Sequence, residues 1–308
     1  MKRPATNTQP LPYSNGQNRD NCRIKIPVCY YQPWELPKND LFLPIQAGKA
    51  LSKFNMKIQG DDTGDNISSK NATFSEFTAW YWAWKNIKAL YPNLEYTGML
   101  HYRRFFDMEN PFDISSINYR SKIPDMKNYD RLYIERLSAA DIILTKPTYL
   151  SLDLKTHYAS QHRETDYLCV RDVIHNICPE YGGSFESVFE SNYLSLCCMF
   201  VSRYELFNDY LAWLFPILFE TEKRIDVSGC SAYQQRCLAF LAERLLNVYV
   251  RHHKLRVSYE PVYFIRPAVD YRNGIGKLCK DLAKYCLPHG IVKLLESKNE
   301  NVVQNASY

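Results

Sequence analysis

The sequence is poor in glycine. Only 11 of its 308 residues are Gly, about half of the usual share of roughly 7%. Loops that bind phosphate through backbone amides need several glycines close together. Neither G-x-G-x-x-G nor G-x-x-x-x-G-K-[ST] occurs in the chain. These absences argue against an ordinary dinucleotide oxidoreductase and against a P-loop NTPase.

Long apolar runs are also missing. The longest, at about 210–219, is interrupted by Pro216 and is shorter than the roughly 20 residues that a transmembrane helix needs. The first 21 residues have no apolar core of the kind found in secretory signals, so the sequons at Asn66, Asn71 and Asn305 carry little weight. We expect a cytoplasmic protein.

Paired cysteines and concentrated positive charge are lacking too. The ten cysteines include no C-x-x-C pair, which argues against a zinc site. The net charge is +5, and no basic run with interleaved aromatic residues occurs, so we expect no nucleic-acid partner.

What is present is an ordinary globular composition, with 46% hydrophobic and 23% charged residues. Apolar segments typical of short strands alternate with segments of helical periodicity. The strands are expected at 24–31, 96–101, 141–145, 196–201 and 257–263, and the helices at 73–91, 155–178, 202–223 and 231–251. This alternation predicts an α/β fold with a mixed sheet flanked by helices.

We divide the chain into a flexible N-terminal segment (1–21), a main domain (22–265) and a basic amphipathic helical tail (266–308). Residues 271–298 carry a net charge of +4, and Lys277, Lys280 and Lys284 share one helical face. Such a helix is expected either to bind an anionic membrane surface or to pack on the main domain.

The strand expected at 96–101 ends in His101-Tyr102-Arg103-Arg104. Ligands of open α/β sheets bind at the carboxyl ends of strands, and guanidinium groups match phosphate oxygens in pairs. We therefore assign His101, Arg103 and Arg104 to a phosphate or diphosphate. The alternative is a structural pair of arginines.

A polar loop and the helix after it supply further candidates. The loop at 60–71 is read either as a binding site for a nucleotide or a metal, or as a solvated turn. Glu76 is read either as the partner of Thr73 in a capping box or as a ligand contact at a helix N-terminus. To donor binding we assign Asp61, Asp62, Asn66, Ser68, Lys70, Asn71 and Glu76.

Two later segments carry candidates for catalysis and for acceptor binding. Asp166 follows His162 by four residues, so that on one helix the two could act together as a general base; a surface ion pair is the alternative. Around 226–244 we expect either an acid or base with its supports, or a stripe of salt bridges within one helix. The catalytic candidates are Asp166, Asp226 and Glu243, with Asp166 or Asp226 preferred as the base, and the acceptor-binding candidates are His157, His162, Tyr233, Arg236 and Arg244.

Several blocks of sequence resemble one family. They include D-D-T-G-D-N-I-S-S-K-N, F-S-E-F-T-A-W-Y-W-A-W-K-N, Y-T-G-M-L-H-Y-R-R-F-F and M-F-V-S-R-Y-E-L-F-N-D-Y-L. Taken together and in this order, these blocks resemble the DUF4422 family of bacterial capsule and O-antigen glycosyltransferases. The resemblance extends over about residues 24–265.

The resemblance implies a GT-A-like, Rossmann-like fold and a nucleotide-sugar donor, with UDP-galactofuranose as one candidate. Familiar GT-A enzymes place Asp-x-Asp, which holds a metal, where this chain has His101 to Arg104. Fixed cations can neutralise a departing diphosphate as a metal does. We therefore expect no metal site and no required cofactor.

Two points remain open within the resemblance. Asp107-x-Glu109 and Asp61-Asp62 are alternative sites for Mn²⁺ or Mg²⁺. The family typically carries Asn just before Met-Phe of the strand at 196–201, where this chain has Cys198.

From these observations we expect a glycosyltransferase that moves a sugar from a UDP-sugar to a lipid-linked glycan. It would act in capsule, O-antigen or exopolysaccharide synthesis, as a peripheral protein on the inner face of the cell membrane. The alternatives are a non-catalytic protein of the same fold that binds glycans or nucleotide sugars, and a nucleotide-sugar hydrolase.

Overall fold

The computed structural model describes residues 19–110 and 117–266. The basic tail therefore lies almost wholly outside the described residues, as does most of the N-terminal segment, of which Arg19–Asn21 forms a turn of 3-10 helix (η1). Within the described ranges, no helix is both long and apolar enough to cross a membrane.

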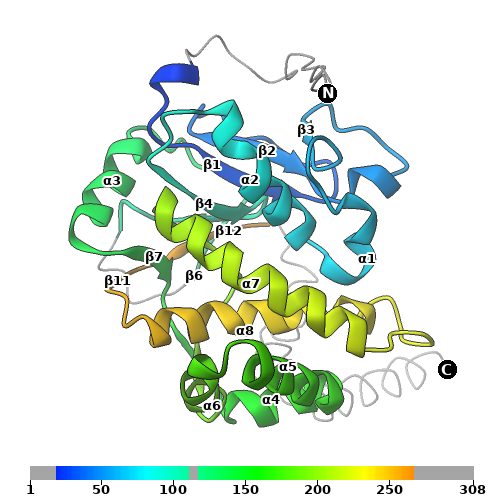
Figure 1. Cartoon of the computed structure of the whole chain (residues 1–308). Coiled ribbons are helices and arrows are strands. Elements are labelled where there is room, and N and C mark those ends of the chain that lie inside the picture. Colours follow the sequence, from blue (N-terminus) through cyan, green and yellow to red (C-terminus); the bar gives the residue numbers. More distant parts are fainter. Residues whose placement is uncertain (1–18, 111–116, 267–308) are drawn as a thin grey trace, which may run out of the picture.

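A mixed, mainly parallel sheet forms the centre of the molecule (Figure 1). The order of its main strands is β11-β7-β10-β4-β1-β2-β3, and β10 alone among these runs antiparallel to its neighbours. These strands are β1 (Ile26–Tyr30), β2 (Phe42–Gln46), β3 (Gln59–Gly60), β4 (Tyr96–His101), β7 (Ile142–Thr145), β10 (Phe200–Arg203) and β11 (Val257–Glu260).

Smaller strands extend the sheet and form a separate ribbon. Strand β5 pairs with β4 and with β12, and β12 also pairs with β6. The bounds are β5 (Arg104–Phe106), β6 (Ile117–Arg120), β12 (Val262–Ile265), and for the ribbon β8 (Thr148–Tyr149) and β9 (Tyr193–Leu194).

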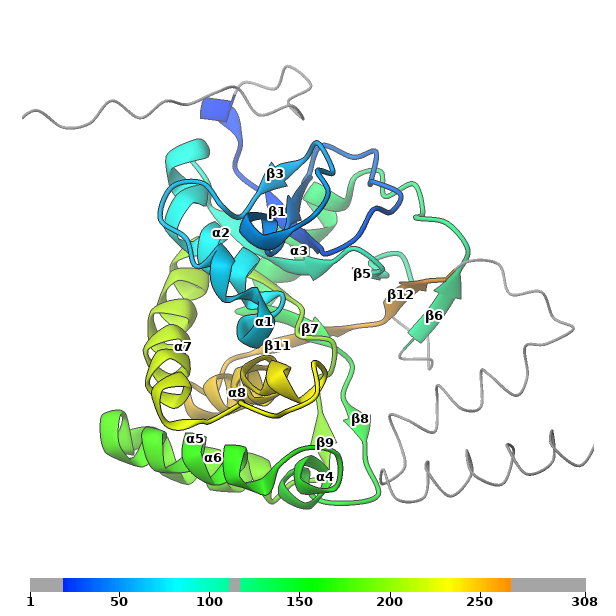
Figure 2. The same cartoon turned by 90° about the vertical axis from the view of Figure 1, so that its right-hand side faces the viewer.

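Helices cover both faces of the sheet. Helices α2, α7 and α8 lie on one face and α3 on the other, while α4, α5 and α6 form an outer layer against α7 and α8 (Figures 1 and 2). The helices are α1 (Asn71–Phe74), α2 (Phe77–Leu90), α3 (Tyr129–Ala139), α4 (Leu154–Gln161), α5 (Glu164–Ile177), α6 (Gly182–Phe189), α7 (Tyr204–Arg224) and α8 (Cys237–His252), with 3-10 turns η2 (Lys49–Leu51), η3 (Ser68–Lys70), η4 (Pro179–Tyr181) and η5 (Gln234–Arg236).

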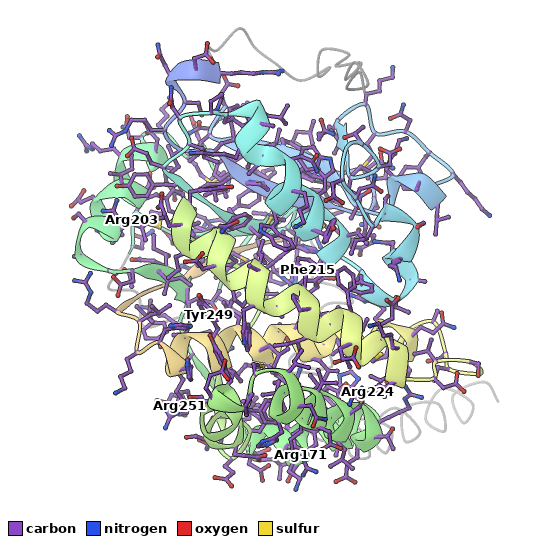
Figure 3. All side chains as sticks on the ribbon, in the orientation of Figure 1. Arg171, Arg203, Phe215, Arg224, Tyr249 and Arg251 are labelled. Carbon is purple, nitrogen blue, oxygen red and sulfur yellow. The ribbon has the colours of Figure 1, made fainter. Side chains whose placement is uncertain are left out.

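The central strands are buried on both faces, so their side chains divide alternately between two cores. Ile142 and Phe200 belong to the core beneath α2, α7 and α8, whereas Ile143 and Val201 belong to the core beneath α3. Figure 3 shows Phe215 of α7 facing α2, where its ring stacks on Trp84 at a centroid distance of 5.5 Å.

Gly98 is required where β4 meets β10. A Cβ atom at this position would lie 2.0 Å from the carbonyl oxygen of Phe200. No side-chain rotation relieves a clash of a Cβ atom with backbone, so the close approach of these strands depends on glycine.

Most of the predicted elements are confirmed. The expected strand at 96–101 has the bounds of β4, and the expected last strand is divided by Pro261 into β11 and β12. The fold class predicted from the sequence, a mixed sheet flanked by helices, is the observed one.

One predicted helix is wrong in a way that affects the site. The chain expected to be helical over 155–178 forms two helices, because α4 ends at Gln161 and α5 begins at Glu164. His162 and Arg163 are both extended between them. His162 and Asp166 therefore do not lie one turn apart on one helix.

Candidate functional site

The topology brings the predicted cations to one edge of the sheet. Strands β1 to β4 are parallel, so Tyr30, Gln46, Gly60 and His101 end at the same edge. Helix α2 connects parallel strands β3 and β4 and must run back across the sheet, so its first residues lie at this edge as well. We call this the carboxyl edge.

Strand β10 contributes its beginning rather than its end. It pairs antiparallel with β4, and Phe200 lies opposite Met99. The residues that precede β10, Cys197 and Cys198, therefore reach the carboxyl edge beside His101.

A tight hairpin presents the cationic side chains. His101 and Arg104 are paired directly across β4 and β5, which places their side chains on the same face. Arg103 lies in the turn, with its guanidinium over the rings of Tyr102 (5.1 Å) and Trp34 (6.0 Å).

His101 is held in its neutral form. Burial lowers its pKa well below the usual value, and the positive charges of Arg104, Arg103 and Arg236 lower it further. The buried Nδ1 atom of His101 and the Nε atom of Arg103 have no hydrogen-bond partner among the described residues. Buried polar atoms without a partner are rare, and here they offer contacts to a ligand.

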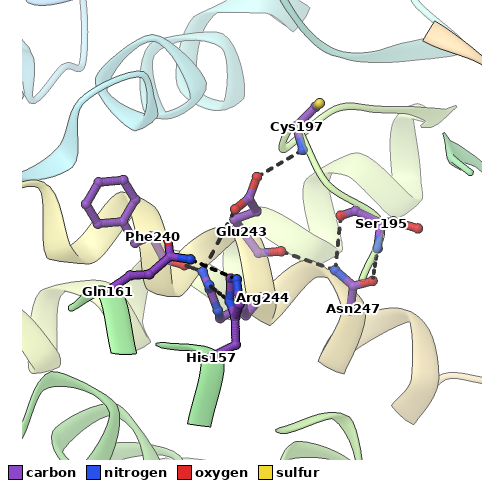
Figure 4. A network of polar contacts seen from close by, with 8 residues as sticks. All are labelled: His157, Gln161, Ser195, Cys197, Phe240, Glu243, Arg244 and Asn247. Carbon is purple, nitrogen blue, oxygen red and sulfur yellow. Dashed lines mark hydrogen bonds and ion pairs between the residues drawn. The ribbon is translucent and has the colours of Figure 1, made fainter. Parts of the chain in front are cut away.

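Helix α8 supplies a carboxylate to the residues that precede β10. Glu243 Oε1 accepts a hydrogen bond of 2.9 Å from the backbone amide of Cys197 (Figure 4). Both Glu243 and Arg104 act electrostatically on the thiols of Cys197 and Cys198. Burial raises the pKa of both thiols, that of Cys198 well above its usual value, so they stay protonated and are poor nucleophiles at neutral pH.

An ion pair joins η5, which directly precedes α8, to the start of α2. Arg236 Nε donates to Ser75 Oγ at 2.7 Å, and its Nη2 lies 3.5 Å from Glu76 Oε2. The expected stripe of salt bridges within one helix is therefore wrong, since Arg236 pairs with another element. The capping box of Thr73 and Glu76 is wrong too, because Glu76 makes no side-chain cap and Thr73 donates to the carbonyl of Lys70.

Behind Glu243, a buried network connects α8 to α4. Arg244 Nη1 donates to the Phe240 carbonyl at 2.8 Å, its Nη2 lies 3.5 Å from His157 Nδ1, and its guanidinium covers the ring of Tyr158 (Figure 4). Arg244 is 3% exposed, and burial lowers its pKa. The network fixes α8 against the outer layer and so fixes the position of Glu243.

The site is also strained. Among the described residues other than glycine, six have positive φ, and three of these are Ser75 (49°), Cys197 (79°) and Cys198 (49°). Cys197 and Cys198 lie at the carboxyl edge, and Ser75 binds Arg236, which pairs with Glu76. Strained backbone gathers at functional sites.

Comparison with known proteins agrees with this architecture. The profile of a domain of unknown function, DUF4422, matches residues 25–254. The chain belongs to the DUF4422 family. No curated protein matches the sequence.

A solved structure is similar to this DUF4422 chain. It is the apo form of WbbM, a bifunctional glycosyltransferase, with 28% sequence identity and a TM-score of 0.70. The match covers 81% of this chain and 48% of the other, so the chain corresponds to about half of that protein. The predicted resemblance and the GT-A-like α/β fold are thereby confirmed.

The loop at 60–71 of this DUF4422 chain is a built structure and not a solvated turn. Asp61 is fully buried, and its carboxylate accepts bonds from the amides of Gly48 and Lys49 and from the hydroxyl of Ser68. Gly48 has a φ of 63°, and a Cβ there would strike Asn71.

The other donor-binding candidates of this loop divide into internal and outward groups. Asn66 and Asn71 bond to backbone within the segment, and Lys70 forms an ion pair with Glu222. Asp62 is exposed. The loop is thus fixed at the carboxyl edge, with Asp62 facing solvent.

Of the four carboxylates named as alternative metal ligands, those of Asp61 and Asp107 are hydrogen-bonded within the protein, whereas Asp62 and Glu109 are exposed. Asp107 is fully buried and accepts bonds from the backbone amides of Glu109 and Asn110 and from the side chain of Asn118. Asp61 is engaged as described above. In the part of the chain that the structure describes, no group of three His, Cys, Asp or Glu residues could hold a metal.

The remaining candidates lie apart from the carboxyl edge. Asp166 is 1% exposed and forms an ion pair of 2.6 Å with Arg163 in the outer helical layer, on the side of α8 away from the sheet (Figure 1). Burial raises the pKa of Asp166, and the bond to Arg163 opposes that shift. Asp226 is exposed and caps the turn at Ser228.

The acceptor-binding candidates form one aromatic cluster. His162 stacks on Phe240 at 4.1 Å and on Tyr233 at 5.8 Å, and its Nδ1 lies 3.3 Å from Gln234 Oε1. His157 and His162 are buried, whereas Tyr233 is 53% exposed. Of this cluster, Tyr233 therefore presents the accessible surface.

Sequence reasoning missed two parts of the site. Cys197 was not singled out, although its neighbour Cys198 was. Tyr31 was also missed; it is 52% exposed, and its ring lies 6.2 Å from that of His101. Its position at the carboxyl end of the first predicted strand is the signal that could have identified it.

Proposed function

We propose that this chain is a glycosyltransferase that takes a sugar from a nucleoside-diphosphate donor, with UDP-sugars as the first candidates. The observation that carries the proposal is the arrangement of His101, Arg103 and Arg104 at the carboxyl edge, beside Cys197, whose amide binds the carboxylate of Glu243. It is supported by the likeness to a bifunctional glycosyltransferase over most of the chain.

Each side chain has a role in this proposal. Arg103 and Arg104 bind the diphosphate and neutralise the charge that grows on it as the sugar leaves. His101, kept neutral, bonds to a phosphate oxygen or to the sugar through its free Nδ1 atom. The exposed ring of Tyr31 stacks on the base.

Glu243 is the carboxylate that we place at the reacting sugar. It is the one of the three catalytic candidates that bonds to a residue of the carboxyl edge, the amide of Cys197. Its position allows it to take the proton of the acceptor hydroxyl or to stabilise the positive charge of the sugar in the transition state. We assign structural roles to Asp166, which pairs with Arg163, and to Asp226, which accepts the amide of Ser228.

The acceptor approaches past α8 and η5 in this proposal. Tyr233 and Arg236 face solvent there, and the buried His157, His162 and Arg244 support them. We propose further that the acceptor is a lipid-linked glycan of capsule, O-antigen or exopolysaccharide synthesis. The donor sugar, of which galactofuranose is one candidate, and a peripheral place on the inner membrane face belong to the same proposal.

The test is a transfer assay on the full chain. A panel of UDP-, GDP- and CMP-sugars is offered with and without oligosaccharide acceptors, and both nucleotide release and the lengthened glycan are measured. Acceptor-dependent release with a new glycosidic product supports the proposal. Release without an acceptor would indicate a hydrolase, and binding of nucleotide sugar without release would indicate a non-catalytic protein; either result overturns the proposal.

A further inference from the structure

Three exposed tyrosines meet on the surface beside the site. Tyr149 of β8 and Tyr193 of β9 are 74% and 41% exposed, and Tyr259 of β11 is 43% exposed. These strands come from three separate parts of the chain. We call Tyr149, Tyr193 and Tyr259 the tyrosine platform.

The β8–β9 ribbon fixes the first two rings. Tyr149 and Tyr193 are directly paired across the ribbon, and their ring centroids are 5.9 Å apart. Paired residues of adjacent strands project to the same face. The ribbon is held by a backbone bond of 2.7 Å from Leu150 to Asn192.

Tyr259 brings the edge strand of the sheet to the same surface. Burial raises the pKa of Tyr259, and the phenols of Tyr193 and Tyr149 raise it further. The backbone places Tyr259 near the ribbon, because it pairs with Leu144 of β7, and β8 begins at Thr148, four residues further along the chain and at most about 14 Å away. Strand β11 is the outermost strand beside β7, so nothing in the described sheet covers it.

The platform is continuous with the carboxyl edge. The chain runs from Tyr193 to Cys197, whose amide binds Glu243, in four residues, a reach of at most about 14 Å. Hydrogen bonds fix this segment to the end of β7, from Ser195 Oγ to the Thr145 carbonyl (2.9 Å) and from Thr145 Oγ1 to the Leu196 carbonyl (2.7 Å). The platform therefore stands at a fixed short distance from Glu243.

We infer that the tyrosine platform binds the glycan chain of the acceptor, several sugar units away from the hydroxyl that receives the new sugar. The inference rests on the proposed glycosyltransferase function, because it names the acceptor of that site. Sugar rings present apolar C–H faces with hydroxyl groups at their rims. Tyrosine rings match both features, since each has an apolar face and a hydroxyl at its tip.

The composition of the platform favours a glycan over a lipid or protein partner. Its three large exposed apolar groups are all phenols, and the exposed Leu51, Phe54 and Ile177 lie on other elements. Lipid chains would leave the hydroxyl groups unbonded, at a cost in free energy. Three rings also form a smaller patch than the roughly 800 Å² per partner that a stable protein interface buries.

The experiment compares glycan binding by the full wild-type chain and by the double variant Tyr149→Ala/Tyr193→Ala. Saturation-transfer NMR is recorded, without any nucleotide sugar, on galacto-, gluco- and manno-oligosaccharides of one to six units. Ile177→Ala, which removes an exposed apolar side chain from α5, is the matched control. Both variants change exposed groups only, and a thermal melt checks that they fold.

We expect wild-type and control protein to bind at least one of the hexasaccharides more tightly than the monosaccharides. The double variant should lose about tenfold in hexasaccharide affinity, since the loss of two aromatic contacts of about 0.5–1.5 kcal/mol each is of that order. Its affinity for monosaccharides should not change.

Several results would overturn the inference. One is that the wild-type protein binds no hexasaccharide, and another is that the control variant loses as much affinity as the double variant. A third is that the double variant keeps its glycan binding and instead loses either dimer formation or binding to anionic vesicles. The outcome is separable from the transfer assay. Hexasaccharide binding that depends on the platform in a chain without transfer activity would leave the platform in place and refute the proposed function. Normal transfer to long acceptors by the double variant would refute the role of the platform and leave the proposed function in place.

Discussion

Replacement of Glu243 by Gln tests the proposed reaction centre most directly. Gln has nearly the same shape, and its amide oxygen can still accept the hydrogen bond from Cys197 that is now 2.9 Å long. The substitution removes one negative charge opposite Arg104 and beside Arg244, whose Nη1 lies 3.9 Å from Glu243 Oε2. It therefore changes the chemistry of the site while leaving its geometry.

The structure allows the cost in stability to be worked out. A hydrogen bond to a charged acceptor contributes about 1 kcal/mol more than one to a neutral acceptor. The ion pair with Arg244 adds at most about 1 kcal/mol, because the Glu243 side chain is 23% exposed and water screens it. The expected loss is about 1–2 kcal/mol, or roughly 2–8 °C in melting temperature for a chain of this size.

The expected loss of activity is much larger. A positioned acid or base contributes about 10²–10⁴-fold to a rate, and we expect kcat for Glu243→Gln to fall within that range. Binding of UDP should change by less than about tenfold, because one lost charge interaction near the diphosphate is of the order of 1.4 kcal/mol. The measurements are initial rates of UDP release with donor and acceptor, UDP affinity by calorimetry, and a thermal melt.

Two controls separate chemistry from folding. Glu220→Gln on α7 removes a carboxylate that pairs only with Lys223 and Arg224 among the described residues, and it should leave all three quantities unchanged. Asp166→Asn breaks the buried pair with Arg163. Because Arg163 remains 31% exposed, this variant should lose stability at or below the lower end of the roughly 3–5 kcal/mol typical of broken buried pairs, but keep its kcat. Full activity in Glu243→Gln, or inactivity in a well-folded Asp166→Asn, would refute the assignment.

Three further predictions concern the sheet, the pH dependence and the metal. Gly98→Ala should destabilise the fold by at least about 2 kcal/mol, because its Cβ atom would meet the Phe200 carbonyl. The control Gly183→Ala in α6, where a Cβ atom meets nothing within 4 Å, should be neutral or stabilising. Equal melting temperatures of the two variants would contradict this prediction. The pKa of His101 is lowered in the folded state, so the unfolded chain takes up a proton on His101 below about pH 6.5 and the folded chain does not. The unfolding free energy should therefore fall from pH 7.5 to pH 5.5, by no more than about 1.4 kcal/mol per pH unit, and less steeply in His101→Gln; identical slopes in denaturant titrations would count against the burial of a neutral imidazole. Turnover should persist in EDTA, because the carboxylates of Asp61 and Asp107 are occupied by N–H and O–H donors; complete loss, restored by Mn²⁺ or Mg²⁺, would show that a metal takes part.

The sequence predicted those helices and strands in which the pattern of apolar residues matches the burial of the same residues in the fold. Strand β4 is a continuous apolar run ending in polar residues, and its bounds were predicted without error. Strand β2 was missed because Pro44 lies within it. The backbone N–H and C=O groups of alternate residues along β2 point toward β1. The carbonyl of Leu41 accepts from Ile26, and the amide of Ala47 donates to Tyr30. The backbone nitrogen of Pro44 therefore points away from β1, toward the side of β3, and the pairing with β3 begins only at Ile45. The N–H that proline lacks is thus not needed for a hydrogen bond between strands.

The helix-start signals were less reliable. Thr73-x-x-Glu76 fits a capping box by spacing, yet the chain turns through Ser75 at positive φ and begins α2 at Phe77. Arg236 attracts Glu76 across the interior of the site. A contact between residues 160 positions apart leaves no local trace in sequence. The same holds for the bond between Cys197 and Glu243, which was therefore not predicted although both residues are polar groups near predicted elements.

The strand-end cations could be predicted because topology alone places them. Any parallel strand that ends in His101 to Arg104 presents these groups at the carboxyl edge. The partners that give the cations their chemistry could not be predicted, because they depend on the reversed strand β10. An antiparallel strand in a parallel sheet contributes its first residues to the edge, and neither propensity nor periodicity reveals its direction.

The scarcity of glycine connects the strain of the site with its chemistry. A glycine-rich loop would reach left-handed conformations without cost and would bind phosphate through bare amides. This chain places Ser75, Cys197 and Cys198 at positive φ instead, at about 1 kcal/mol or more for each residue. The amide of Cys197 is directed to Glu243 and not left for a ligand. Backbone strain here therefore positions a carboxylate, and in the proposed function the guanidinium groups of Arg103 and Arg104 bind the diphosphate.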